Sequence, residues 1–185
     1  MLYTTERYEA YITVEEYLKR YVDVEQFLEC CKTCPNYNMI WACPPYDFDV
    51  LDYWNRYKVL QLIAVKINYG EGYAGESFTQ EQLDEIERSS VWQVKAELTS
   101  ELYRMEQKNP GSISLSAGSC MICNRRCARA DGKPCRFPDK VRYSIESLGG
   151  NVGTTISELM EIELEWVQEG RLPSHYVLVC GLLRP

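Results

Sequence analysis

The sequence predicts an α+β fold: a mixed sheet with a strand–helix–strand crossover, a C-terminal β-hairpin and two cysteine-rich loops. Three observations lead to this prediction. Residues 58–68 form a nearly continuous apolar run, which is typical of a central strand. The segment Thr79-Gln80-Glu81-Gln82 has the form of a capping box and opens a long amphipathic helix that ends at Asn109-Pro110-Gly111. Two groups of closely spaced cysteines interrupt the regular elements.

The N-terminal segment predicts a short strand followed by two helices. Residues 7–12 alternate loosely between polar and apolar side chains, as a strand would. Thr13-Val14-Glu15-Glu16 then resembles a capping box, and Asp23 can begin a second short helix. We expect one domain over residues 1–185, with residues 1–30 as an N-terminal strand and helix appendage.

The middle of the chain predicts a helical crossover between two strands. The helix over residues 79–108 carries an apolar stripe at helical spacing, and residues 113–117 follow as a strand. A strand, a helix and a further strand in this order favour a parallel connection, which makes the sheet mixed. Short helices are expected at residues 139–148 and 154–160.

The C-terminal segment predicts a β-hairpin. Residues 162–167 alternate between apolar and acidic side chains, and residues 175–183 form an apolar run. Residues 168–174 between them contain Gly170 and Pro173, which favour a turn.

Composition narrows the class of protein. The chain of 185 residues is 45% hydrophobic, which is enough to build a core. Its net charge of −7 disfavours nucleic-acid binding. No apolar run approaches the length of a membrane span, and the first residues do not resemble a signal peptide. We therefore expect a cytoplasmic protein with no nucleic-acid partner and no membrane partner.

Cysteine is the most informative residue type. The chain has nine cysteines, and in a reducing compartment this number favours metal binding over disulfides. Seven of them fall into two groups that each contain a Cys-x-x-Cys pair, a spacing that lets two thiolates hold one metal. The predicted metal ligands are Cys31, Cys34 and Cys43 in the first loop, and Cys120, Cys123, Cys127 and Cys135 in the second.

Two kinds of metal centre agree with this spacing. The four cysteines of the second group can hold one [4Fe–4S] cluster, and the three of the first group can hold a cluster that leaves one iron open. Alternatively, Cys31 and Cys34 can pair with Cys120 and Cys123 around a tetrahedral zinc ion. The zinc arrangement leaves Cys43, Cys127 and Cys135 unused, so the spacing favours an iron–sulfur cluster over zinc.

The second cysteine group lies in a basic stretch of the acidic chain. A solvated loop, compensation of an anionic cluster and docking of an acidic partner are all compatible with this charge. The basic residues are Arg125, Arg126, Arg129, Lys133, Arg136, Lys140 and Arg142.

The motifs resemble a family of uncharacterised predicted metal-binding proteins, domain of unknown function 2284. The resemblance extends from about Tyr21 to Leu183, and it implies that the seven grouped cysteines are the metal ligands while Cys30 and Cys180 are extra. It implies no particular reaction. The segments that carry it are Cys31-Lys-Thr-Cys34-Pro-Asn-Tyr37, Trp41-Ala-Cys43-Pro44-Pro45, Cys120-x2-Cys123-x3-Cys127, Pro134-Cys135-Arg136 and Glu146-Ser-Leu-Gly149.

From these observations we expect an iron–sulfur protein that transfers electrons to a redox protein partner. One alternative is an enzyme with an open-coordination iron–sulfur site, and another is a zinc-stabilised structural or regulatory module. The sequence predicts no catalytic residue and no oligomeric state.

Overall fold

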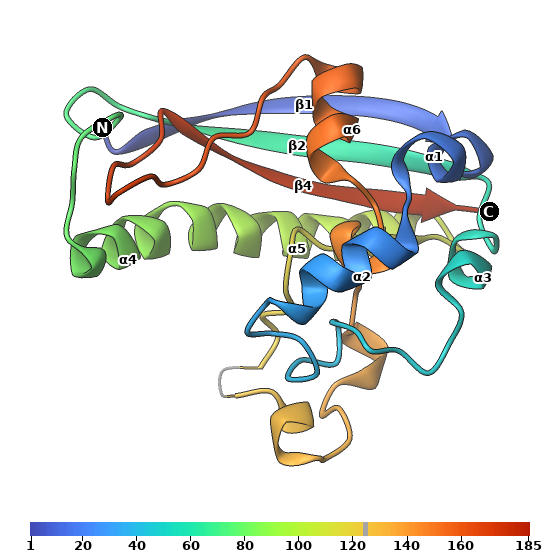
Figure 1. Cartoon of the computed structure of the whole chain (residues 1–185). Helices are drawn as coiled ribbons and strands as arrows, with labels where there is room; N and C mark the ends of the chain where they lie inside the picture. Colours follow the sequence, from blue (N-terminus) through green and yellow to red (C-terminus); the bar gives the residue numbers. More distant parts are fainter. Residues whose placement is uncertain (124–125) are drawn as a thin grey trace.

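The computed structural model describes residues 1–123 and 126–185 of the chain. An antiparallel sheet carries helices on both faces, so the predicted α+β class is confirmed (Figure 1). The elements in chain order are β1 (Tyr3–Thr13), α1 (Val14–Tyr21), α2 (Val24–Lys32), α3 (Val50–Trp54), β2 (Val59–Tyr69), α4 (Gln80–Ser89), α5 (Val91–Lys108), β3 (Ile113–Leu115), α6 (Val152–Met160) and β4 (His175–Arg184), with 3₁₀ turns η1 (Ala128–Asp131), η2 (Pro138–Lys140) and η3 (Glu146–Leu148).

The sheet has the order β1-β2-β4-β3, and every pair of neighbouring strands is antiparallel. The prediction of a mixed sheet is therefore wrong. The helical crossover does join β2 to β3 in the same direction, because both strands run antiparallel to β4. However, β4 lies between them, so no parallel pair forms.

The predicted C-terminal hairpin is also wrong. β4 is hydrogen-bonded to β2 along one edge and to β3 along the other. A strand has only two edges, so none remains for residues 162–167. That segment forms no strand, and its Ile162 side chain is buried in the main hydrophobic core.

Strand β2 is the centre of the core because its two faces are both covered. Leu60, Leu62 and Ala64 face the cluster built with α1, α3 and α6. Ile63 and Ile67 face the opposite cluster, to which α5 contributes its apolar stripe. The alternation follows from the period of two residues in a strand. This confirms the predicted central strand and the core-facing helix.

The predicted helix over residues 79–108 is two helices that meet at Ser90. The capping box is present, with the Thr79 hydroxyl and the Gln82 side chain bonded to each other's backbone amides. Ser90 has φ −126° and ψ −79°, outside the helical region. Its hydroxyl is buried and shares a 2.9 Å hydrogen bond with the Tyr69 hydroxyl at the end of β2. The hydrogen bond between Ser90 and Tyr69 therefore coincides with the break between α4 and α5.

Other segments differ in detail from the sequence predictions. The helix predicted at residues 139–148 is instead the two 3₁₀ turns η2 and η3. The helix predicted at residues 154–160 is confirmed as α6. The domain division, with residues 1–30 as an appendage, stays a prediction. In the structure β1 pairs with β2 over its whole length, and Tyr17 of α1 is buried.

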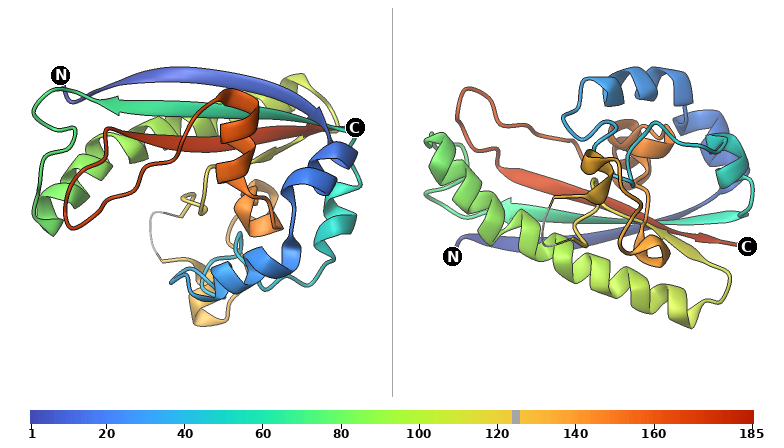
Figure 2. Two further views of the ribbon diagram at one scale, coloured as in Figure 1. Left: turned by 45° about the horizontal axis from the view of Figure 1, so that its top comes forward. Right: turned by 90° about the horizontal axis from the view of Figure 1, so that it is seen from below.

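Both cysteine loops lie at one end of the molecule, away from the sheet and next to α2 (Figures 1 and 2). The turn that follows η3 positions α2. The Gly149 carbonyl accepts a 2.9 Å hydrogen bond from the Asp23 amide, at the start of α2. Gly149 has φ +84°, and a Cβ atom there would come within 2.8 Å of the Val24 Cα atom. Only glycine meets both requirements without strain.

We expect Gly149→Ala to lower the free energy of unfolding by more than about 2 kcal/mol, because the left-handed backbone and the contact with Val24 both penalise a Cβ atom. Urea denaturation measures the change. Gly72→Ala is the matched control, since Gly72 has the same φ of +84° with no atom within 4 Å of the added carbon. Equal losses in the two variants would show that the approach to Val24 is unimportant.

Candidate metal centre

The first cysteine group lies at the end of α2 and in the turns that follow it. Cys31 belongs to the last turn of the helix. The Cys34 amide donates to the Cys31 carbonyl at 3.0 Å, and the Cys43 amide donates to the Ile40 carbonyl at 3.0 Å. Tight turns of this kind allow both thiols of a Cys-x-x-Cys pair to reach one metal.

The second group follows β3. Cys127 precedes the 3₁₀ turn η1, and Cys135 precedes η2. The Phe137 amide donates to the Cys135 sulfur at 3.4 Å. Such amide–sulfur bonds stabilise a thiolate and tune a metal that it binds.

Arg129 of η1 joins the second loop to the first. Its guanidinium donates to the carbonyl oxygens of Ile40 at 3.1 Å, of Cys43 at 2.5 Å and of Pro45 at 2.6 Å. The same group stacks over the Trp41 ring, 4.9 Å from its centroid. One side chain thus fixes the backbone on both sides of Cys43 relative to the second loop.

Trp41 forms a second link between the loops. Its indole nitrogen donates to the Lys133 carbonyl at 3.0 Å. The two cysteine groups are therefore held side by side, although about ninety residues separate them in the chain.

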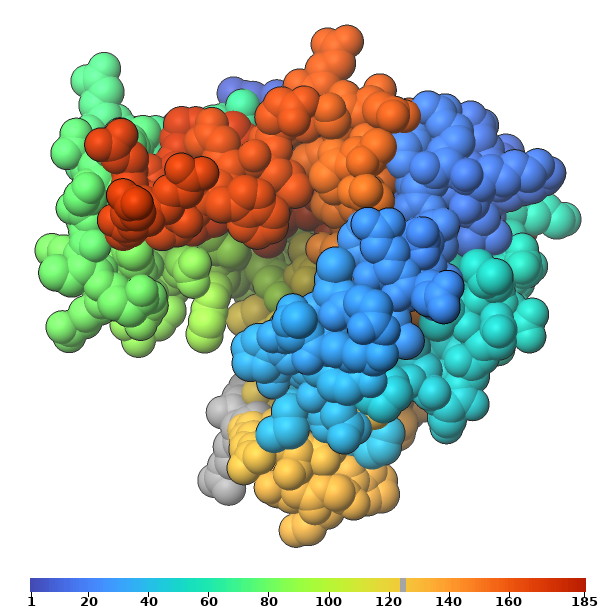
Figure 3. Space-filling model, viewed as in Figure 1, coloured from blue at the N-terminus to red at the C-terminus, as the bar shows by residue number. Residues whose placement is uncertain are grey.

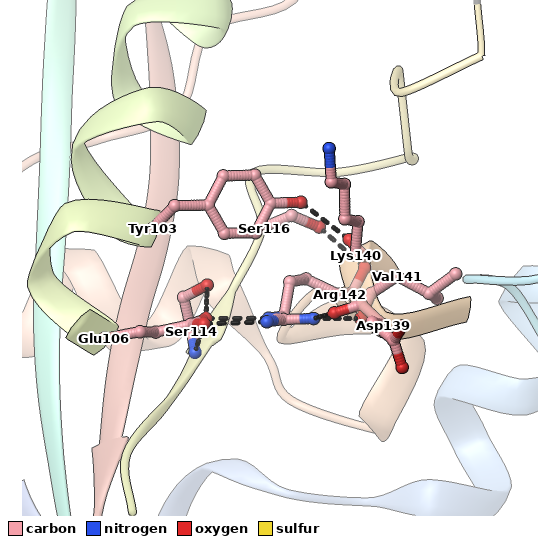
Figure 4. Close-up of polar contacts among 8 residues, drawn as sticks. All are labelled: Tyr103, Glu106, Ser114, Ser116, Asp139, Lys140, Val141 and Arg142. Carbon is pink, nitrogen blue, oxygen red and sulfur yellow. Dashed lines mark hydrogen bonds and ion pairs between the residues drawn. The ribbon is translucent and has the colours of Figure 1, made fainter. Parts of the chain in front are cut away.

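The second loop is anchored at its base to α5 and β3 (Figure 4). Glu106 of α5 forms a two-pronged ion pair with Arg142, with both nitrogen–oxygen distances 2.7 Å. The same carboxylate accepts hydrogen bonds from the amide and the hydroxyl of Ser114 in β3. Tyr103 donates its hydroxyl to the Lys140 carbonyl at 2.6 Å.

An aromatic cluster supports the first loop from inside. The Tyr46 ring stacks on Phe48 with centroids 4.8 Å apart and meets the edge of Tyr143 at 5.0 Å. Its hydroxyl donates to the Ala42 carbonyl at 2.9 Å, next to Cys43. The loop therefore rests on an apolar base that belongs to the main core.

All nine cysteines are free thiols. Cys30 and Cys34 are exposed, and Cys180 is buried in β4 against α5. The other six are half-buried: Cys31, Cys43, Cys120, Cys123, Cys127 and Cys135. Partial burial leaves these thiols accessible to a metal.

Burial raises the pKa of the Cys43 thiol to about 11, with the charges of Cys34 and Cys31 adding to the rise. Arg129 opposes this rise, while Cys120 of the second loop adds to it, so the two groups lie within electrostatic range of each other. Burial also raises the pKa of Cys31 and of Cys120. A metal that binds here must displace thiol protons.

The donor set fits a metal that prefers thiolate ligands. The structure brings the two predicted cysteine groups together, and which of these cysteines bind metal stays a prediction. Within residues 1–123 and 126–185, no three cysteine, histidine or acidic side chains already form a metal-binding arrangement. His175 bonds to Ser174 and to the Glu163 carbonyl, away from both loops.

Lys95 and Glu146 also belong to this end of the molecule. Lys95 of α5 donates to the Ser119 carbonyl at 2.7 Å, and burial lowers its pKa although Glu146 and Cys120 oppose this. Burial raises the pKa of Glu146, opposed by its own amide, by Ser144 and by Lys95. No motif in the sequence points to Lys95. Glu146 belongs to the Glu146-Ser-Leu-Gly149 segment of the resemblance, which implies no role for it. Arg125, one of the basic residues, lies outside the described residues.

The fold brings two groups of thiols to one end of the molecule, which is the class of arrangement that a metal-binding protein uses. The chain belongs to the family described as predicted metal-binding protein (DUF2284), whose model matches residues 19–183. Neither the curated proteins nor the solved structures contain a significant match to the chain. In the part of the chain that the structure describes, no helix is both long and apolar enough to cross a membrane.

We expect Arg129→Lys to weaken metal binding roughly tenfold, since residues that orient ligand loops typically contribute this much. A lysine keeps the charge but cannot bond three carbonyl groups and stack on Trp41 in the same way. Competition with a chromophoric chelator measures the affinity. Arg104→Lys is the control, because Arg104 is exposed on α5. Unchanged affinity in Arg129→Lys would contradict the role given to this contact.

The Glu106–Arg142 pair predicts an acid-sensitive anchor. Burial opposes ionisation of Glu106, but Arg142 and Ser114 outweigh it and hold its pKa below the ordinary 4.5. A lowered folded-state pKa adds stability above pH 4.5 that is lost as pH falls through the folded value.

Glu106→Gln should therefore cost about 2 kcal/mol of unfolding free energy near neutral pH, because Arg142 loses a charged partner. The difference from wild type should shrink as the pH is lowered below 4.5. Thermal melting across this pH range is the measurement. A difference that stays constant down to the acid limit would refute the assigned pKa direction.

Proposed function

We propose that the two cysteine loops hold at least one [4Fe–4S] cluster and that the protein transfers single electrons to a redox protein partner. The observation that supports this most strongly is the contact of Arg129 with the first loop, because it holds the two cysteine loops side by side. When bound, such a cluster supplies one-electron redox chemistry.

The choice of iron–sulfur over zinc rests on the number of thiols in these loops. Zinc bound by Cys31, Cys34, Cys120 and Cys123 would leave three half-buried thiols in the same two loops without a function. Four thiols of the second loop fit a cubane cluster, and the three of the first loop would leave one iron open.

Electron transfer is supported by exposure and charge. Six of the thiols are half-buried and Cys34 is exposed, so a cluster held by them lies close to the surface. Arg126, Lys133 and Arg136 are exposed beside it and present positive charge to an acidic partner. We include a cytoplasmic location in the proposal, because reduced thiols are needed to assemble the centre.

Anaerobically purified protein should be brown and should contain iron and acid-labile sulfide. Cys123→Ser should lower the iron content and the melting temperature together, because metal-binding energy that exists only in the folded state, on the order of 10 kcal/mol for structural zinc, is also folding energy. Cys31→Ser should act in the same direction.

Cys30→Ser and Cys180→Ser are the matched controls and should keep the full iron content. Loss of iron in either control would show that the ligands are wrongly assigned. A colourless protein that contains zinc would reject the iron–sulfur proposal and favour the structural module.

A further inference from the structure

A cleft of about 700 Å³ adjoins the second cysteine loop. It lies between α5, β4 and residues 117–123, and Cys120 and Cys123 form part of its wall. Figure 3 shows the surface hollowed below the C-terminal segment in red, with α5 in green on one side and the second loop in yellow beneath. The volume is in the range of small-molecule binding sites.

Besides the two thiols, one basic and one acidic side chain line this cleft, Lys95 and Glu146. Lys95 uses one hydrogen of its ammonium group for the Ser119 carbonyl, and a lysine has three to donate. The Glu146 oxygen Oε2 is shielded from solvent and has no hydrogen-bond partner among the described residues. A buried carboxylate oxygen without a partner is costly, and a ligand with a hydrogen-bond donor would remove that cost.

Most of the remaining lining is apolar or aromatic. Val91, Val177 and Leu178 contribute aliphatic side chains. Trp92 and Trp166 also line the cleft although they are 51% and 69% exposed. Two exposed tryptophan rings at one cleft are suited to contact the face of an aromatic ligand.

We propose that this cleft binds a small aromatic carboxylic acid that carries a hydroxyl group. Its carboxylate pairs with Lys95, its hydroxyl donates to Glu146, and its ring contacts Trp92 and Trp166. The bound acid lies beside the metal held through Cys120 and Cys123. Only this last statement rests on the proposed function, since the binding groups belong to the protein.

The test uses 3-phenyllactate as the probe, titrated calorimetrically into the full-length, metal-loaded protein. Two analogues each remove one feature: 3-phenylpropionate lacks the hydroxyl, and 3-phenyllactamide lacks the charge. We expect phenyllactate to bind about tenfold more tightly than either, because phenylpropionate leaves the bond to Glu146 unmade and phenyllactamide offers Lys95 a neutral oxygen in place of a carboxylate.

Lys95→Gln should weaken phenyllactate binding about tenfold and weaken phenyllactamide binding much less, because only phenyllactate loses an ion pair. Glu146→Leu, which has no hydrogen-bonding group, should remove the preference for phenyllactate over phenylpropionate. Lys108→Gln is the matched control, because Lys108 is exposed at the far end of the same helix. Trp92→Ala, at a half-exposed position, should weaken binding about fivefold, and it tests the cleft even if a buried substitution fails to fold.

The outcomes separate the two proposals. Saturable binding with the expected pattern among the variants supports the proposed ligand site. If the protein contains zinc, the same binding result still supports the ligand site, while the zinc itself rejects the iron–sulfur proposal. Iron-loaded protein that does not bind phenyllactate overturns the cleft proposal and leaves the cluster intact. A change in the visible spectrum of the cluster on addition of phenyllactate supports the adjacency of ligand and metal, and an unchanged spectrum during saturable binding overturns that adjacency.

Discussion

The guanidinium of Arg129 is the contact on which the arrangement of the cysteine loops depends. A planar group with five fixed donors can bond several carbonyl oxygens at once, and here it bonds three in the first loop. Trp41 of the first loop stacks on Arg129 and donates a hydrogen bond to the Lys133 carbonyl of the second loop. Because backbone groups are held, this contact fixes the main chain beside Cys43 and leaves the thiol itself unengaged.

This contact joins two loops that have separate foundations. The first loop continues from α2, which is held by the close backbone approach of Gly149 to Val24. The second loop returns to the sheet through the Glu106–Arg142 pair. The segment from Arg142 to Gly149 connects these two supports, and it also carries Glu146. A disturbance of either support would therefore reach the metal centre and the cleft together.

The sequence predicts the local elements of this protein, but it does not predict the strand order or the contacts between distant residues. The Thr79 capping box, the apolar β2 and the Cys-x-x-Cys groups are defined by neighbours in the chain, so their spacing alone predicts them. The insertion of β4 between β2 and β3 depends on which strand edges are free to pair, and that is a property of the whole sheet. The break at Ser90 coincides with a hydroxyl contact to Tyr69. The spacing of residues along the chain cannot identify a distant partner such as Tyr69. It also cannot identify the carbonyl groups to which Arg129 donates.

The aromatic cluster beneath the first loop gives the metal centre two unlike sides. Tyr46, Phe48 and Tyr143 present rings on the inner side, while Cys34 faces water on the outer side. The surroundings of a metal centre help to set its reduction potential. The rings on the inner side are fixed by the fold, whereas the water on the outer side can be displaced. A protein that covers this side would expel that water. In the electron transfer that we propose, docking would then change the driving force itself, so that recognition of a partner and the readiness to exchange an electron with it become one event.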